Sequence, residues 1–578
     1  MKQYMPKYRS VYFIISAVFC APLLPTIVLA QAAPSRTAPE SLLPPKNNSA
    51  NEITLPETLT AQAPKGSEVT IVHVATVSVE GGPPAFAAAI DAATKGLAQR
   101  DVTVAELYAA AAQIEVAYAR AGLVFTRATV PPQTITNGGV FRIIIVDGFI
   151  EAIDYSAVPA HVRNAVRKRA AKLVGVRGLT LTQIERRVLL AGAVPGVQLR
   201  STLVRGTAVG ATRLVLQADY RPVSLSLSAD NGVGSAYQNL SLSGQLSLNS
   251  VLGLGELIYM QATTAPDVGT LFGSNPNRRI LGAGAIIPLG SNGLTFNPEY
   301  TNVTTNPRTG AGTTSILGQY ARFALRASYP LIKTRKQTLD FSGSFELISE
   351  NEIARAFNLL LNKDRLRIAA LGLNWAKSLD TRNSLSSELL FSHGIAGLGA
   401  RTPNDALISG IQFSRQGSQP DFSKLSGSIR LDTQLGGGFA LSNSFRGQIS
   451  MTGALPAAAQ VSLDGTDGLS SFDLGSLSVD SGVTGRSELS HPIAFRYTAK
   501  AILTPYVFGA AGFGHVSQPT ALEQANLKVW SLGAGLRVLL SPAKSHIASY
   551  GSIEVSHGHS SNLNSDPTRI NASISFRF

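Results

Sequence analysis

The sequence contains little cysteine and little charge. Cys20 is the only cysteine among 578 residues, which excludes a disulfide scaffold, a cysteine-ligated zinc site and an iron–sulfur cluster. Only 15% of the residues are charged, against about 25% in ordinary soluble domains. Glycine is frequent, with 53 residues, and long charge runs are absent. This composition argues against a disordered chain, and the length argues for more than one folded unit.

Beyond its N-terminus the sequence also lacks a long apolar run. A membrane-spanning helix requires about 20 predominantly apolar residues. The Ala-rich stretch 103–122 carries Glu106, Glu115 and Arg120, so it is expected to be a soluble amphipathic helix. If the protein lies in a membrane, it must therefore cross it as strands.

The first thirty residues have the pattern of an export signal. A basic start precedes an apolar stretch at residues 11–30, small residues follow, and cleavage is expected after Ala30 or Ala32. The alternative is a membrane anchor helix, which Pro22 and Pro25 inside the stretch disfavour. The formal net charge of +14 would suit nucleic-acid binding, but an export signal argues against a nucleic-acid partner.

After the signal, the sequence divides into four parts. Residues 31–67 are rich in proline and polar residues and are expected to form a linker. Residues 68–149 and 150–221 each show the order strand, helix, helix, strand, strand, which predicts two small α+β domains. In residues 222–578 helical periodicity disappears, and apolar residues alternate with polar ones as in strands with one apolar face.

Sixteen alternating segments can be placed in residues 222–578. They begin near residues 223, 238, 255, 280, 293, 318, 337, 365, 382, 424, 439, 485, 499, 526, 546 and 569. Connections after even-numbered strands are short, whereas most of those after odd-numbered strands are long, such as 303–317, 349–364, 394–423 and 451–484. Short turns at one end and long loops at the other are typical of an outer-membrane barrel. The predicted fold is therefore a transmembrane β-barrel of about sixteen antiparallel strands preceded by two small α+β domains.

The last predicted strand ends on an aromatic residue. Phe576 and Phe578 lie at alternate positions at the end of the chain. Bacterial outer-membrane barrels commonly end in this way, and the barrel-assembly machinery reads that end. We therefore expect Phe576 and Phe578 to form the assembly signal.

Short motifs along the chain point to one family. They are, in chain order, Val130–Gln133, Val146–Ile150, Leu181–Arg186, Val194–Val197, Asp230–Gly232, Leu252–Glu256, Arg486–Pro492 and Thr504–Phe508. In order and spacing, residues 68–578 resemble the haemolysin and filamentous-haemagglutinin secretion/activation family, the outer-membrane transporters of two-partner secretion. The resemblance implies that the two small domains are POTRA-like.

The resemblance also implies a function. The POTRA-like domains would lie in the periplasm of a Gram-negative bacterium and capture the N-terminal secretion domain of a large exoprotein of adhesin or haemolysin type. The barrel, in the outer membrane, would conduct this client unfolded to the cell surface. The implied partners are the exoprotein, outer-membrane lipid and the barrel-assembly machinery, and no cofactor, catalytic residue or metal is expected.

The same resemblance suggests which residues would contact the client. Extended clients can pair with exposed sheet edges through backbone hydrogen bonds. The candidate contacts in the motifs of the two domains are Pro131, Pro132, Gln133, Glu185, Arg186, Pro195 and Gly196.

The long loop 451–484 departs from the family pattern. In the family, the sixth extracellular loop folds into the pore, and the arginine of its V-R-G-Y/F tip docks on the acid of an F-x-D/E-x-G motif in the wall. Here the nearest loop string is Val483-Thr484-Gly485-Arg486, with Thr484 where the arginine should be. The wall motif reads Phe508-Gly509-Ala510-Ala511-Gly512, with Ala510 in place of the acid.

Both halves of the family's ion pair are thus missing together. Removing one partner of a buried pair costs about 3–5 kcal/mol, so losing both is easier than losing one. We expect the loop to fill the pore as a lid that is anchored differently. The alternative is that Arg486 is an ordinary strand residue.

Two other functions are weighed against secretion. A barrel insertase of the same superfamily usually has more POTRA repeats and keeps its loop arginine. An outer-membrane hydrolase would need a Ser–His pair, and the sequence contains no G-x-S-x-G, H-E-x-x-H or P-loop string. His557 and His559 share one face of a predicted strand but have no third metal ligand nearby.

Overall fold

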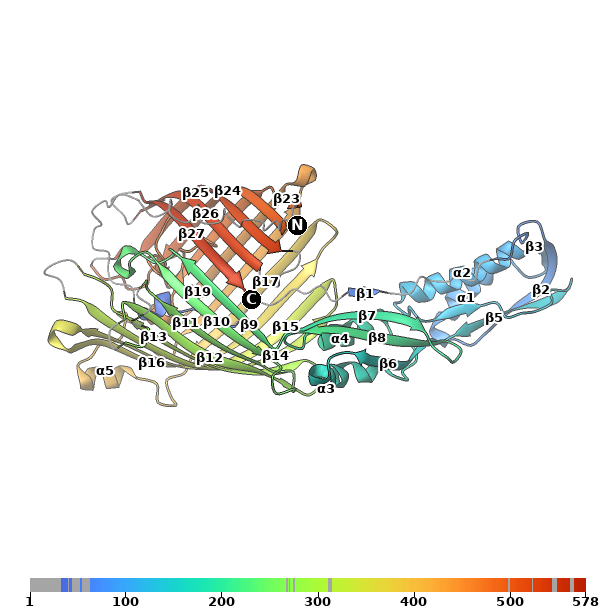
Figure 1. Cartoon of the computed structure of the whole chain (residues 1–578), viewed down its shortest axis with the longest axis horizontal. Helices are drawn as coiled ribbons and strands as arrows, with labels where there is room; N and C mark the ends of the chain where they lie inside the picture. Colours follow the sequence, from blue (N-terminus) through green and yellow to red (C-terminus); the bar gives the residue numbers. More distant parts are fainter. Residues whose placement is uncertain are drawn as a thin grey trace, which may run out of the picture.

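The computed structural model describes two small domains in a row and a large barrel (Figure 1). The described residues are 33–39, 41–43, 52–54, 63–266, 269, 271–273, 276–309, 314–496, 499–521, 523–542, 548–561 and 566–578. The predicted export signal lies outside them. None of the helices in these ranges has both the length and the apolar character needed to cross a membrane.

The first domain lies farthest from the barrel (Figure 1). Its elements are β2 (Ile71–Glu80), η2 (Pro84–Phe86), α1 (Ala87–Thr94), β3 (Arg100–Thr103), α2 (Val104–Arg120), β4 (Arg127–Thr129) and β5 (Gly139–Val146). The sheet order is β3-β2-β5-β4, and α2 packs Leu107, Ile114 and Tyr118 into the core. A capping box begins α2, in which Thr103 and Glu106 satisfy each other's backbone N–H groups. Hydrogen bonds from the Thr103 backbone and hydroxyl lower the pKa of Glu106.

The second domain repeats this arrangement next to the barrel. Its elements are β6 (Phe149–Ala157), α3 (Ala160–Ala170), η3 (Ala171–Leu173), α4 (Leu181–Gly192), β7 (Val197–Arg205) and β8 (Ala211–Tyr220). A capping box of Thr180 and Gln183 begins α4. The sheet order is β1-β7-β8-β6. The edge strand β1 (Glu52–Thr54) comes from the segment predicted as a linker and pairs in parallel with β7.

Within the described residues, sixteen strands close into one antiparallel barrel. They are β9 (Val223–Asp230), β10 (Ser241–Asn249), β11 (Leu257–Thr264), β12 (Arg278–Leu289), β13 (Leu294–Thr305), β14 (Ile316–Lys333), β15 (Gln337–Ala354), β16 (Leu359–Ser378), β17 (Asn383–Gly394), β18 (Ser423–Gln434), β19 (Ala440–Ser450), β22 (Ser481–Ser490) with its continuation β23 (Ile493–Arg496), β24 (Ala499–His515), β25 (Asn526–Pro542), β26 (Ala548–Ser560) and β27 (Thr568–Arg577). Pairing of β27 with β9 closes the ring.

The barrel strands carry their apolar side chains outward. Leu371 and Leu532 are each 56% exposed, whereas charged groups such as Glu299 and Arg322 are buried in the interior. This arrangement is the reverse of a soluble sheet and is expected where lipid surrounds the strands. The alternation predicted from the sequence is therefore confirmed, and the strand starts agree closely, with the largest difference at β16, which begins at Leu359 rather than near residue 365.

One predicted long loop is wrong. Residues 349–364 were expected to form a loop, but β15 runs to Ala354 and β16 begins at Leu359, so only η6 (Arg355–Phe357) connects them. Cross-strand pairing continues there because polar side chains suit strands that project beyond the membrane. The connection between β17 and β18 is long and carries α5 (Pro403–Ser409).

The second domain is joined to the short turns of the barrel. Glu185 accepts a 2.7 Å hydrogen bond from Nε of Arg335, and Arg186 donates to the carbonyl of Pro330 at 2.7 Å. His161 contacts the carbonyl of Ser250 at 2.9 Å. The short-turn end of the barrel therefore faces the second domain, and the long loops lie at the opposite end.

Candidate functional site

The long connection between β19 and β22 folds into the barrel. Residues 451–480 form a hairpin of β20 (Val461–Ser462) and β21 (Ser478–Val479), preceded by η8 (Ala457–Ala459). Leu469 and Phe472 pack against Tyr506, Phe508 and Ala510 of the wall. Leu455 and Ala459 pack into a separate cluster with Ile280, Val303, Tyr320, Ile348, Leu366, Ile368 and Phe422. The loop therefore contacts two sides of the wall and crosses the lumen.

The loop tip lies against buried charges of the barrel wall. Arg486 donates from Nη2 to Glu554 at 2.7 Å and to Glu488 at 3.2 Å, and its guanidinium carbon lies 3.5 Å from the centre of the Phe508 ring. Arg537 donates to Glu488 at 2.8 Å. The wall thus neutralises its own charges, as buried ions require.

The tip is held to this wall by neutral and charged contacts. Nη1 of Arg486 donates to the hydroxyl of Ser470 at 3.3 Å, and Asn571 donates to the carbonyl of Ser470 at 2.7 Å. Asp473 forms an ion pair with Arg569 of β27. The loop supplies the acid and the wall supplies the arginine, so the polarity is the reverse of the one that the family resemblance implies.

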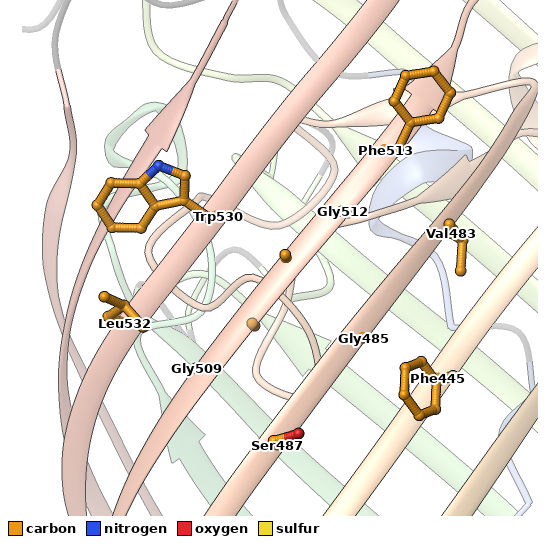
Figure 2. Close-up of a pocket in the computed structure, with 11 residues that line it drawn as sticks. Phe445, Val483, Gly485, Ser487, Gly509, Gly512, Phe513, Trp530 and Leu532 are labelled. Carbon is orange, nitrogen blue, oxygen red and sulfur yellow. The ribbon is translucent and has the colours of Figure 1, made fainter.

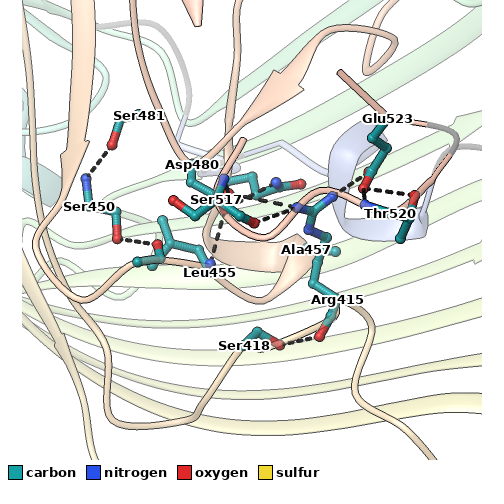
Figure 3. Close-up of polar contacts among 12 residues, drawn as sticks. Arg415, Ser418, Ser450, Leu455, Ala457, Asp480, Ser481, Ser517, Thr520 and Glu523 are labelled. Atoms are coloured by element: carbon teal, nitrogen blue, oxygen red, sulfur yellow. Dashed lines mark hydrogen bonds and ion pairs between the residues drawn. The ribbon is translucent and has the colours of Figure 1, made fainter. Parts of the chain in front are cut away.

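Asp480 anchors the base of the loop and ties three loops together (Figure 3). Its carboxylate accepts hydrogen bonds from the backbone N–H of Leu455 at 2.9 Å and of Ser517 at 2.8 Å. Arg415, from the connection between β17 and β18, lies 3.7 Å from the same carboxylate and also pairs with Glu523. Both ends of the lumenal hairpin are therefore fixed by aspartates.

Residues 33–43, where described, also lie inside the barrel. Ser35 donates its backbone N–H to Glu350 at 2.9 Å, and Leu42 donates to Glu299 at 3.0 Å. Arg36 donates to Gln460 of the loop at 2.8 Å. The prediction of a plain linker is thus incomplete: the short 3-10 helix η1 (Pro34–Thr37) and the fully buried Leu42 occupy the lumen.

The prediction that Val483–Arg486 form the tip of the lid loop is wrong. The alternative, that Arg486 is an ordinary strand residue, is confirmed. Thr484 and Arg486 lie in strand β22, where Arg486 is paired with Ala510 and Thr484 with Gly512 of β24. Residues of these two strands and of their neighbours line a cavity of about 740 Å³, as Figure 2 shows. Its lining residues are Phe445, Val483, Gly485, Ser487, Gly509, Ala510, Ala511, Gly512, Phe513, Trp530 and Leu532. The structure therefore brings the two motifs together as wall strands, and the loop tip is residues 469–473.

The predicted client contacts of the second domain lie at its joint with the barrel. Glu185 and Arg186 contact the turn after β14 and neighbouring backbone. The carbonyl of Pro195 accepts from Ser250 at 2.9 Å, and a Cβ at Gly196 would lie 2.3 Å from the carbonyl oxygen of Arg221. These four residues therefore lie where the domain meets the barrel, Glu185 is buried and the other three are half-buried, and their contact with a client stays a prediction.

The predicted residues of the first domain end a strand. The segment with Pro131 and Pro132 follows β4, since proline has no N–H for the sheet. Gln133 replaces the missing ladder bonds, because its amide donates to the carbonyl of Arg142 at 2.8 Å and accepts from the Arg142 N–H at 3.0 Å.

The two terminal aromatics lie on the strand that closes the barrel. Phe576 pairs with Leu227, and the N–H of Phe578 donates to the carbonyl of Leu225 at 2.8 Å. Both side chains are partly exposed on the outer face, at 36% and 44%.

His557 and His559, also near this edge, flank the Trp530 ring, and the described residues contain no cluster of three potential metal ligands.

Sequence reasoning missed the residues that anchor the loop. A signal was present, because the loop carries four aspartates, Asp464, Asp467, Asp473 and Asp480, and no lysine or arginine. A loop of one sign predicts a wall of the opposite sign where the two meet.

Comparison with known proteins identifies the family. The family described as haemolysin secretion/activation protein ShlB/FhaC/HecB matches residues 210–538, more than half of the chain. The ShlB-type POTRA domain matches residues 72–148. The hemolysin transporter protein HpmB of Proteus mirabilis is 24% identical over 396 residues, a match that covers 65% of this chain and 64% of HpmB. The chain thus matches slightly less than two thirds of the length of that relative.

Two solved structures share the fold. CdiB from Escherichia coli superposes with a TM-score of 0.70 at 19% identity, covering 90% of this chain and 93% of that chain. CdiB from Acinetobacter baumannii superposes with a TM-score of 0.60 at 14% identity, covering 91% of this chain and 94% of that chain. The barrel therefore lies in the outer membrane, and the POTRA-type domains lie in the periplasm. Family match and fold agree, and the chain belongs to the haemolysin secretion/activation protein family ShlB/FhaC/HecB.

Proposed function

We propose that this protein recognises a large exoprotein of adhesin or haemolysin type in the periplasm and translocates it, unfolded, to the cell surface. The family is one of transporters, which supports transport rather than catalysis. HpmB is named a hemolysin transporter, and we assign the same class of cargo here. We further propose that the barrel-assembly machinery inserts the protein through its last strand, β27, and the Phe578 that follows it.

The contents of the barrel lumen are the main support for translocation through the barrel. Among the described residues, the lumen holds residues 33–39 and 41–43 and the hairpin 451–480, which are connected to the wall through side chains and short apolar contacts rather than through the sheet. Segments held in this way can leave while the sixteen wall strands stay paired. Removal of both would open a path for an extended chain.

We propose that the first domain takes part in client capture and that an extended strand of the client pairs at a sheet edge of the second domain. Strand β1 pairs there in parallel with Arg200, Ser201 and Thr202 of β7. This edge thus accepts a three-residue extended segment through backbone hydrogen bonds, the mode by which extended peptides join a sheet. A client strand that replaced β1 would also pull on residues 33–43, because both belong to the same N-terminal segment.

A tether between loop and wall tests the transport path. A Cβ built on Gly558 of β26 would lie 3.0 Å from Cβ of Ser471, close to the roughly 3.5–4.5 Å of a disulfide. Cys20 is the only natural cysteine and lies in the predicted signal, so Ser471→Cys with Gly558→Cys adds a single cysteine pair. A Cβ at Gly558 would also lie 2.6 Å from the carbonyl oxygen of Trp530, so Gly558→Cys alone is included as a control that should export normally. The assay measures export of an exoprotein from the same genome that carries an N-terminal secretion domain.

Export should stop when the pair is oxidised and resume after reduction, whereas Ser471→Cys alone should export normally under both conditions. Unchanged export through a demonstrably oxidised pair would show that the client does not need the loop to move.

Deletion of residues 68–149 should abolish export and leave an inserted, heat-resistant barrel. Normal export by this variant would refute capture by the first domain.

A further inference from the structure

A stripe of three cations runs along the outer face of β16. Lys363, Arg365 and Arg367 occupy alternate positions, so their side chains share one face of the strand at about 6.6–6.8 Å per step. The same face continues with Leu371, 56% exposed, and Leu373, 40% exposed. Along this strand, basic groups therefore stand directly above the apolar band that faces lipid.

The stripe lies at the outer end of the barrel. The short turns of the barrel contact the second domain, which is periplasmic. Strand β16 reaches the short turn 379–382 at its Ser378 end, so its Leu359 end points away from the periplasm. The cations are thus at the level where the outer leaflet has its head groups.

The cations of the stripe are not neutralised by the protein. Arg367 donates only to carbonyl oxygens, those of Leu398 at 2.9 Å, Gly399 at 3.4 Å and its own neighbour Leu366 at 2.8 Å. Among the described residues, no carboxylate lies within ion-pair distance of Lys363, Arg365 or Arg367. Two guanidinium groups at neighbouring positions repel each other unless an anion lies between them.

The neighbouring strand β15 places no acid opposite the three cations. The paired residues on β15 are Leu347, Ser349 and Asn351, and His393 of β17 is exposed beside Ala369. The pKa of Asp405 in α5 is lowered mainly by the hydrogen bonds from Thr402 that cap the helix, and Arg365 lowers this pKa to a smaller extent. This carboxylate is already used within α5.

Exposed apolar side chains accompany the cations. The connection that carries α5 contacts β16 through Arg367 and presents Leu398, Leu407 and Ile408, which are 72%, 82% and 78% exposed. In Figure 1, α5 lies beside the outer end of the strand wall rather than over the lumen. Apolar groups next to a basic stripe are characteristic of surfaces that lie in a lipid head-group region.

We propose that the outer face of β16, with the α5 connection, binds a phosphorylated glycolipid of the outer leaflet, of the lipid A type. The guanidinium groups of Arg365 and Arg367 bind phosphate, for which planar arginine is well suited. Lys363 adds a third cation one step further out. The acyl chains of the same molecule lie along Leu371 and Leu373. The proposal rests on the outer-membrane location and is independent of export.

The test measures binding of defined lipids to the purified full-length protein. Native mass spectrometry in detergent micelles compares bisphosphorylated lipid A, the same lipid A without phosphates, and phosphatidylglycerol. The variants are Arg365→Gln and the triple Lys363→Gln/Arg365→Gln/Arg367→Gln. The control is Lys377→Gln, which removes the same charge at the periplasmic end of the same outward face.

The triple variant should bind bisphosphorylated lipid A about tenfold or more weakly, and Arg365→Gln should lose part of the affinity. Lys377→Gln should bind like the wild type, and dephosphorylated lipid A should bind weakly to every variant. If the triple variant does not fold, Arg365→Gln still decides, because this exposed side chain makes no ion pair among the described residues. Equal binding of phosphatidylglycerol, or an equal loss with Lys377→Gln, would overturn the proposal.

Discussion

The ion pair between Asp473 and Arg569 can be removed by the single change Asp473→Asn. Arg569 is 12% exposed and Asp473 is 41% exposed. Exposed pairs contribute about 0.2–1 kcal/mol, and breaking a buried pair costs about 3–5 kcal/mol. Because solvent reaches Asp473, the lower range applies, and about 1 kcal/mol is expected.

Such a loss favours the state in which the loop tip has left the wall. About 1 kcal/mol corresponds to a change of about fivefold in an equilibrium constant. Planar-bilayer recordings of the full-length protein should therefore show openings that occupy about five times more of the recording. The effect should shrink at high salt, because the Debye length falls from about 10 Å at 0.1 M to about 3 Å at 1 M.

The same loop offers a matched control. Asp467→Asn removes an equal charge from an exposed position that makes no ion pair among the described residues. A double-mutant cycle with Arg569→Gln isolates the coupling between the two side chains. If Asp467→Asn increases opening as much as Asp473→Asn, the effect comes from loop charge in general, and the anchor deduced from the structure is refuted.

Further predictions concern the wall and the two domains. Arg486→Gln leaves Glu554 without its cation and should destabilise the barrel by about 3–5 kcal/mol. Heat-modifiability gels should then show a lower temperature of unfolding. An unchanged temperature would contradict the role of this buried pair. Gly148→Ala places a Cβ 2.3 Å from the carbonyl oxygen of Phe125 and should loosen the junction of the two domains, so that limited proteolysis cleaves there faster. The control is Gly436→Ala, because a Cβ there meets no atom within 4 Å and Gly436, like Gly148, has no positive φ. Thr103→Ala removes the capping box of α2 and should cost the first domain about 1 kcal/mol, seen as faster amide exchange in α2 with no change in the barrel strands.

The reversed anchor explains how the chain manages without the family's pair. In the wall, Arg486 is neutralised by Glu554 and Glu488, so it needs no acid at Ala510. In the loop, Ser470 accepts from Arg486 where a cation would be repelled. The loop can therefore carry negative charge, and Asp473 forms an ion pair with Arg569 of β27.

The sequence alone determined the elements that depend on neighbours along the chain. Alternation of apolar and polar residues predicts strands because the side-chain period of a strand is two, and it located all sixteen barrel strands. The capping boxes at Thr103 and Thr180 predict helix starts because Glu106 and Gln183 lie three residues away. Motif order was enough to indicate the family.

Tertiary structure decided everything that depends on register and closure. Arg486 faces inward and opposite Ala510 only because β22 and β24 pair with that register, and a shift of one residue would turn it to the lipid. Asp473 meets Arg569 only because the barrel closes, which brings together positions that no local pattern connects. Residues 33–43 look like a linker in sequence, since prolines prevent a regular helix, but Glu299 and Glu350 provide acceptors for their N–H groups inside the lumen. Contacts between distant segments form only after the wall exists, so a local pattern such as the four aspartates of the loop indicates the sign of the partner but not which residue it meets.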